Sequence, residues 1–108
     1  MAKYVMVVQS NAAPGRDDDY NKWYDTIHFQ DICDLPGVKS GRRFESTPIA
    51  MGPAGQPYLS IFEIETDDPG AFMAEMGKRS ADGTMRQTDA LDFSSVALWI
   101  YEQREMPT

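Results

Sequence analysis

Residues 17–44, DDDYNKWYDTIHFQDICDLPGVKSGRRF, decide the fold that the rest of the chain completes. Three aspartates open the stretch, as at a helix N-terminus, where acceptors and negative charge stabilise the unpaired N–H groups of the first turn. Pro36 and Gly37 end it, because proline cannot continue a helix and glycine can adopt the left-handed turn that follows one. The pattern therefore predicts a helix over residues 18–35 and a strand over residues 38–46.

Two polar residues fall in the apolar half of this predicted helix. At about 100° per residue, His28 and Asp31 lie among the aromatic and aliphatic positions, whereas Cys33 faces solvent and Phe29 is an exposed exception. A carboxylate in a buried stripe is costly unless it is paired or hydrogen-bonded. We expect Asp31 to pair with His28, one turn away, or with Arg42 or Arg43 of the following strand.

Composition limits the possible classes of protein. The 108 residues suffice for one domain, residues 1–108, and the 42% hydrophobic content is ordinary for a soluble globular chain. A net charge of −7 argues against nucleic acid and anionic membranes as partners. No apolar run approaches the roughly 20 residues of a membrane helix, and the N-terminus does not resemble a signal peptide. With a single cysteine, and hence no internal disulfide, we expect a cytoplasmic protein.

The remaining elements give the order βαββαβ. We expect further strands over residues 3–9, 58–65 and 93–101, and a second helix over residues 69–78 that begins at Pro69. This order predicts an α+β, ferredoxin-like domain, in which a four-stranded antiparallel sheet carries both helices on one face. Two longer connections, residues 47–57 and 79–92, are candidate lids, and residues 84–91 allow one or two helical turns.

The sheet face without helices also needs a cover. In the first strand Met6 and Val8 alternate with Val5 and Val7, so both faces of the sheet are apolar. Two sheets packed face to face would bury the uncovered side. We therefore predict a homodimer.

A family resemblance rests on the opening stretch. Its residues are Asn21-x-Trp23-Tyr24-Asp25-x-x-His28-x-x-Asp31-Ile32 and then Leu35-Pro36-Gly37-Val38-x-Ser40-x-Arg42-Arg43-Phe44. This pattern resembles that of the EthD-like families of the dimeric α+β barrel superfamily, W-Y-x-x-H-x-x-D followed by a Pro-Gly stop and an Arg-rich strand. The resemblance implies a homodimeric barrel with a pocket between helices and sheet, lined by His28. The superfamily includes cofactor-free monooxygenases, lactone isomerases, polyketide cyclases, lyases, haem-handling enzymes and members without known activity, so the fold does not decide the function.

The candidate catalytic residues are His28, Tyr24 and Arg42. His28 is the only side chain of its type and titrates near neutrality, which suits a general acid or base. Tyr24, one turn earlier, would donate a hydrogen bond to a substrate oxygen. Arg42 shares strand parity with Val38 and Phe44, which predicts that it points inward and clamps a carboxylate or phenolate. The competing interpretations are a helix histidine bonded to a backbone carbonyl, a core tyrosine with a satisfied hydroxyl, and an arginine in an ion pair with Asp31.

Substrate contacts are predicted for Asp31, Phe44, Phe62 and Trp99, since aromatic walls suit a flat aromatic or polyketide-like compound. In the competing interpretation these aromatic residues belong to the core and the dimer interface. Cys33 is expected to be inert.

No cofactor is expected. One histidine and one cysteine cannot form a zinc site, and the first strand is not followed by a glycine-rich phosphate loop. A haem would need His28 as its axial ligand.

The sequence thus predicts a cofactor-independent enzyme of aromatic or polyketide-like catabolism, a lyase or isomerase in which His28 transfers a proton. A cofactor-free monooxygenase, a haem-binding protein and a non-catalytic protein that binds small molecules are the alternatives.

Overall fold

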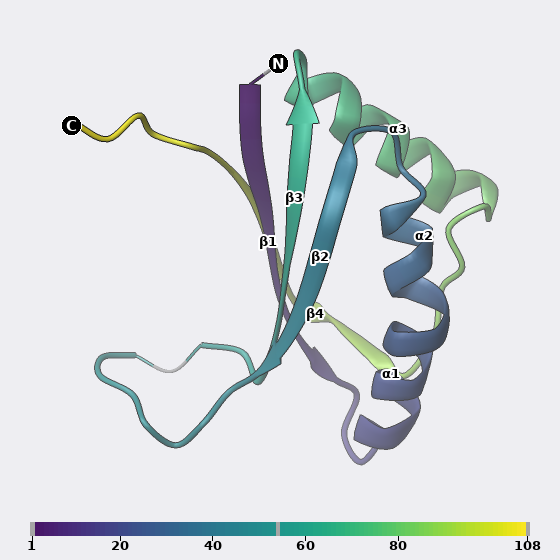
Figure 1. Ribbon diagram of the computed structural model, residues 1–108. Helices are drawn as coiled ribbons and strands as arrows, with labels where there is room; N and C mark the ends of the chain where they lie inside the picture. The colour runs from purple at the N-terminus through teal and green to yellow at the C-terminus, as the bar shows by residue number, and fades with distance from the viewer. Residues whose placement is uncertain (1, 54, 108) are drawn as a thin grey trace.

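The computed structural model describes residues 2–53 and 55–107, and Figure 1 shows a single sheet with both helical segments on one side. The strands are β1 (Ala2–Ala12), β2 (Val38–Glu45), β3 (Tyr58–Thr66) and β4 (Leu91–Glu102). They pair antiparallel in the order β2-β3-β1-β4. The first helical segment consists of α1 (Asp17–Trp23), a π-helical turn η1 (Tyr24–His28) and α2 (Phe29–Cys33); the second is α3 (Pro69–Asp82). The predicted ferredoxin-like α+β fold is confirmed.

The ends of α3 follow from its sequence. The Asp68 carboxylate accepts a hydrogen bond from the backbone N–H of Ala71 at 3.0 Å, and Pro69 occupies the first turn, where its missing N–H costs nothing. Gly83 ends the helix in the left-handed conformation with φ 83°. The helix is therefore longer than predicted, and residues 84–90 form no helical turn but an irregular connection.

A π-helical turn interrupts the first helical segment. The backbone N–H of Phe29 bonds to the carbonyl of Tyr24, five residues earlier, instead of the carbonyl four residues earlier. The extra residue in this turn changes the direction of every later side chain relative to an unbroken α-helix. Phe29 and Cys33 consequently pack partly buried against the core, and the prediction that both face solvent is wrong.

A β-bulge at Lys39 has a similar effect on β2. Val38 lies opposite Ile64 of β3, and the next paired residue, Ser40, lies opposite Glu63. Side chains alternate along a strand, so one unpaired residue moves every later side chain of β2 to the sheet face opposite the one expected.

After the bulge, Arg43 faces the helices and Arg42 faces away from them. The Arg43 guanidinium carbon lies 4.2 Å from the ring centre of Tyr24, whereas that of Arg42 lies near the ring of Phe44. Gly41 shares the inner face, where an added Cβ would come within 2.6 Å of the Phe62 ring. The prediction that Arg42 points inward is wrong because it assumed an unbroken alternation.

The core fills the space between the sheet and the helical segments. Met6, Phe62 and Tyr20 are fully buried there, and the hydroxyls of Tyr20 and Ser10 share a hydrogen bond of 2.6 Å. The opposite sheet face carries apolar side chains with no covering layer, among them Trp99, which is 65% exposed. No helix in the described part of the chain is long and apolar enough to cross a bilayer.

Candidate functional site

A cavity of about 190 Å³ lies beside the His28 ring, and we call it the His28 cavity. Side chains from α1, η1, α2, α3, the α3–β4 connection, β1 and β4 surround it. Its lining residues are Val8, Ser10, Trp23, Tyr24, His28, Ile32, Met76, Ser80, Met85, Gln87, Leu91, Phe93, Val96 and Leu98. The cavity is thus largely apolar, with a few polar groups, as small-molecule sites generally are.

The π-helical turn builds the aromatic wall of this cavity. The rings of Trp23 and His28, five residues apart, stack with centres 4.4 Å apart and an interplanar angle of 16°. Tyr24 meets the same imidazole edge-on at 4.8 Å. In a regular α-helix, residues five apart point in directions about 140° apart, so this stack depends on the wider turn.

The His28 side chain is half-buried and has no hydrogen-bond partner among the described residues. Its Nδ1 atom is buried and unpaired. Burial lowers the pKa of His28 to about 4, with a smaller opposing effect from the Asp31 carboxylate and a further small lowering from Arg43. The ring is therefore uncharged at neutral pH. No described protein group bonds to the ring and fixes its tautomer.

Tyr24 contributes its ring to the cavity lining. Its hydroxyl is buried and lies beside the Ser60 hydroxyl, which does not line the cavity. Burial raises the pKa of Tyr24 to about 12, and Ser60 offsets part of the effect. Tyr24 thus remains protonated at neutral pH.

Asp31 pairs with an arginine that the sequence analysis did not consider. The Arg86 guanidinium donates from Nη2 to Asp31 Oδ1 at 2.7 Å and from Nε to Oδ2 at 3.2 Å, and the Arg86 backbone N–H adds a third bond of 3.0 Å. These bonds hold the pKa of Asp31 below its ordinary value. An ion pair is thus present, but the predicted partners in the second strand are wrong.

The Asp31–Arg86 pair joins α2 to the α3–β4 connection beside the cavity. The Arg86 carbonyl also accepts a hydrogen bond from Trp23 Nε1 at 3.2 Å. Met85, only 3% exposed, and Gln87 both line the cavity. Of the two predicted lids, this connection borders the cavity, whereas none of the described residues of the β2–β3 connection lines it.

Five residues predicted to contact substrate or act in catalysis lie elsewhere. Arg42 and Phe44 occupy the open sheet face, and Trp99 is exposed on the same face. Phe62 is fully buried in the core, with its ring 5.5 Å from that of Phe29. Asp31 does not line the cavity either, and its carboxylate is bound to Arg86. Only His28 and Tyr24 of the predicted site residues reach the cavity.

Arg43 holds the neighbouring region together. Its guanidinium donates to Asp25 at 2.6 Å and to Asn21 at 3.0 Å, and it lies over the Tyr24 ring. It therefore joins β2 to the first helical segment. Arg43 does not line the His28 cavity.

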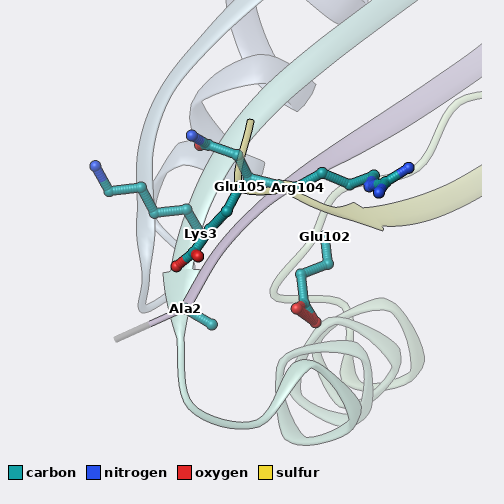
Figure 2. A pocket seen from close by; sticks show the side chains of 6 residues that line it. Ala2, Lys3, Glu102, Arg104 and Glu105 are labelled. Carbon is teal, nitrogen blue, oxygen red and sulfur yellow. The ribbon is translucent and has the colours of Figure 1, made fainter. Parts of the chain in front are cut away.

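A larger hollow of about 490 Å³ lies at the other end of β4, where the C-terminal tail passes the start of β1. Figure 2 shows that charged side chains border it, among them Lys3, Glu102, Arg104 and Glu105. It shares no lining residue with the His28 cavity. Within the described residues, no three His, Cys, Asp or Glu side chains gather as metal ligands do.

Sequence reasoning missed three residues that shape the site. Trp23 was not among the predicted site residues, and the α-helical period separates it from His28. Arg86 and Met85 lie in a connection without periodicity, and no sequence signal assigns either to Asp31 or to a cavity. A W-x4-H spacing would indicate the stack only if the π-helical turn were already known.

No protein-family model matches the chain, and no curated protein matches it by sequence. Solved structures do match it over nearly its full length. An ethyl tert-butyl ether D (EthD) family protein from Bacillus halodurans C-125 aligns with a TM-score of 0.60 and 16% identity over 96% of this chain and 100% of its own.

Two further structures show the same likeness. A protein from Shewanella loihica PV-4, described as a candidate monooxygenase, aligns with a TM-score of 0.62 and 16% identity over 99% of this chain and 97% of its own. HapK from Hahella chejuensis aligns with a TM-score of 0.57 and 15% identity over 100% of this chain and 95% of its own. The chain therefore shares the ferredoxin-like α+β fold of an EthD family protein, in agreement with the resemblance of its opening motif.

Proposed function

We propose that the protein is a cofactor-independent enzyme of the lyase or isomerase type that acts on small aromatic or polyketide-like compounds in the His28 cavity. One observation carries the proposal: the rings of His28 and Tyr24, with centres 4.8 Å apart, both line one largely apolar cavity. An imidazole beside such a cavity can take up and return a proton of a molecule held there.

The protonation states of His28 and Tyr24 give the two side chains different roles in the proposed reaction. His28 is uncharged at neutral pH and can accept a proton from the substrate at a ring nitrogen. Tyr24 stays protonated and stabilises the negative charge that develops on the substrate oxygen. Return of the same proton to a different substrate atom gives an isomer, and loss of a leaving group gives elimination. Neither outcome consumes a cofactor.

The low pKa of His28 limits the substrates that such a mechanism can use. An imidazolium with a pKa of about 4 is a stronger acid than an ordinary imidazolium, so the neutral ring of His28 is a weaker base than an ordinary imidazole. It can take a proton only where the substrate itself stabilises the resulting anion. Carbons between a carbonyl and an aromatic ring, enols and phenols meet this condition, and these groups are typical of aromatic and polyketide-like compounds.

Proton transfer can be tested without knowledge of the natural substrate. The probe 2-tetralone carries acidic protons between its carbonyl and its aromatic ring, and their exchange with solvent deuterium is followed by proton NMR. We expect the protein to accelerate exchange, His28→Phe to reduce the acceleration by at least about 100-fold, and Tyr24→Phe by about 10- to 100-fold. Ser40→Ala, on the open sheet face, is the matched control. Equal rates in the wild type and in folded His28→Phe would remove His28 from the mechanism.

Cofactor-free oxygenation is the second candidate, and it is supported by the Shewanella loihica neighbour described as a candidate monooxygenase. A substrate anion formed beside His28 could itself react with oxygen in a cavity that excludes most water. Oxygen uptake on addition of an electron-rich phenol distinguishes this reaction from isomerisation. Binding without exchange or oxygen uptake would instead indicate a non-catalytic binding protein.

We further propose that two copies associate through the open sheet face. Apolar residues of all four strands gather there, namely Val5, Val7, Phe44, Leu59, Ile61, Ala97, Trp99 and Tyr101. In Figure 1 the β2–β3 connection extends to the lower left, away from the helices, and it carries the exposed Ile49 and Met51. A second sheet packed on this face would bury a surface that is costly to leave in water.

A further inference from the structure

The His28 cavity has a closed inner end and an open mouth. Its lining residues from β1, α1, η1 and α2 are buried or half-buried, and Ile32 of α2 is only 2% exposed. The lining residues Phe93 and Val96 of β4 are instead 62% and 40% exposed. The mouth therefore lies beside β4, and a ligand that enters there extends toward the first helical segment.

Met85 belongs to the closed inner end, although it comes from a connection at the surface. Its neighbours in the chain, Thr84 and Arg86, are exposed, whereas Met85 itself is 3% exposed. Its side chain shares a cluster of buried core residues with Ile32, and both side chains line the cavity. Met85 thus points inward from the α3–β4 connection and closes part of the inner end.

The backbone on both sides of the Met85 side chain is held in place. The Met85 N–H donates to the Arg79 carbonyl of α3 at 2.9 Å. Arg86, the next residue, donates to the Asp31 carboxylate of α2, and its carbonyl accepts a hydrogen bond from Trp23 of α1. The connection is therefore joined to three helices at this point. Met85 cannot withdraw from the cavity unless some of these bonds break.

The end of the Met85 side chain is held as well. The Ser80 hydroxyl donates a weak hydrogen bond to the Met85 sulfur at 3.7 Å. A methionine is otherwise flexible and adapts its shape to a neighbouring molecule. Met76, the other methionine of the lining, lies on α3 and is half-buried. Of the two, Met85 is therefore the one that sets a fixed limit to the cavity.

The lining and the volume of the cavity define what this inner end can enclose. None of the described lining residues is an arginine, lysine, aspartate or glutamate, so an ionised group would stay at the mouth, in contact with water. An apolar protein cavity of about 150 Å³ holds benzene. At about 190 Å³, the His28 cavity has room for a ring with a short substituent. The enclosed part of a ligand is thus uncharged, apolar and limited in length.

We propose that Met85 is the specificity-determining residue of the His28 cavity, because it closes the inner end and excludes ligands with a long apolar substituent. This inference rests on the proposed function, in which the cavity holds the substrate. It adds the side chain that limits the length of that substrate.

Two phenols that differ by three CH₂ groups test the proposal by equilibrium binding, which requires no turnover. 4-Methylphenol and 4-butylphenol are both uncharged at pH 7.5, and shifts of backbone amide resonances around the cavity give their affinities. Burial of the three added CH₂ groups would strengthen binding about 50-fold. We expect the wild type to bind 4-butylphenol less than about fivefold tighter than 4-methylphenol, because Met85 leaves the longer chain no room.

Variants assign the limit to Met85. Met85→Ala removes the three side-chain atoms beyond Cβ, so it should bind 4-butylphenol at least about tenfold tighter than 4-methylphenol. Met85→Val makes a smaller space and should also raise this ratio above that of the wild type, which covers the case that Met85→Ala does not fold. Met73→Ala is the same truncation on the exposed side of α3, outside the lining, and should retain the wild-type ratio. Met76→Ala should raise the ratio less than Met85→Ala does.

Several outcomes would overturn the inference. A wild-type preference of about fivefold or more for 4-butylphenol would show that the inner end is already open. An unchanged ratio in the folded Met85 variants, or an equal rise in Met76→Ala, would show that Met85 does not set the limit. Absence of binding by both phenols would overturn it too.

The same measurements separate this inference from the enzyme proposal. A length limit that Met85→Ala relieves, without exchange of 2-tetralone, would support the role of Met85 while the enzyme proposal failed. Accelerated exchange together with a strong wild-type preference for 4-butylphenol would overturn the role of Met85 and leave the enzyme proposal standing.

Discussion

The imidazole of His28 is uncharged over most of the physiological pH range because partial burial removes much of its contact with water. Its pKa falls from 6.5 to about 4 on burial, so between these values the unfolded chain binds a proton that the folded chain does not. The free energy of unfolding must then decrease as the pH falls through this interval. The pKa of Asp31 is also lowered, but its contribution is present above the ordinary value of 3.8 and is lost only as the pH falls below it. The two effects therefore occupy different pH windows.

Urea unfolding at pH 7.5 and pH 4.5 should show this effect of His28. The wild type should lose roughly 2–3 kcal/mol more than His28→Phe between the two pH values, as an order-of-magnitude figure from the pKa difference. Measurement of both proteins at one concentration cancels the effect of the shared carboxylates. Parallel pH profiles would show that the imidazole is accessible to water in the folded state.

At the same scale, sequence reasoning identified two of the residues at the cavity but not their chemical state. Helical spacing was sufficient to place His28 and Tyr24 on the buried side. It was not sufficient to predict their missing partners, because a missing hydrogen bond depends on what every neighbouring element supplies. The arginine partner of Asp31 was missed for the same reason.

At the scale of elements, two local irregularities separate the prediction from the structure. The π-helical turn brings Phe29 and Cys33 toward the core, and the bulge at Lys39 exchanges Arg42 for Arg43. Each irregularity adds one residue to its element. A prediction that assumes 100° per residue in a helix or 180° in a strand then places the later side chains in the wrong direction. The Thr26 hydroxyl bonds to the Lys22 carbonyl at 2.5 Å beside the π-helical turn, but threonine alone does not predict such a turn.

The α3–β4 connection should depend on the Asp31–Arg86 pair for its position. Arg86→Met keeps the side-chain length but leaves Asp31, which is 9% exposed, without its partner. We expect a loss of about 1–3 kcal/mol in the free energy of unfolding, below the range for fully buried pairs because Arg86 is 57% exposed. Urea unfolding measures the loss, and amide hydrogen exchange of residues 84–88 should become faster.

Arg16→Met is the matched control for removal of an arginine from an ion pair. Arg16 pairs with the exposed Asp19 and Asp89, and such surface pairs contribute about 1 kcal/mol or less. An equal effect of the two substitutions, with unchanged exchange in residues 84–88, would show that Asp31 does not fasten the connection.

At the scale of the whole molecule, the order of elements was sufficient to predict the fold. Four strands and two helical segments in the order βαββαβ allow few arrangements, and the apolar periodicity of the elements selects the one observed. The cavity was less predictable, because it lies where η1, α3 and an irregular connection meet. Its lining combines residues from positions 8 to 98, and no local pattern specifies such a combination.

The open sheet face leads to a prediction about assembly. Light scattering at micromolar concentration should give twice the 12.2 kDa of one chain. Trp99→Glu, in the middle of the proposed interface, should give a monomer, since a buried unpaired carboxylate opposes association. Met73→Glu, on the exposed side of α3, should remain dimeric. A monomeric wild type would contradict the face-to-face assembly.

The most direct test of the site is a pH titration of the single histidine by NMR, with and without 4-methylphenol. Because His28 is the only imidazole in the chain, its ring resonances need no assignment by mutation. The account predicts a titration midpoint near 4 in the free protein and a shift of the ring resonances when the phenol is added at pH 7.5. A midpoint near 6.5 together with no response to the phenol would show an ordinary solvent-exposed histidine and contradict the account.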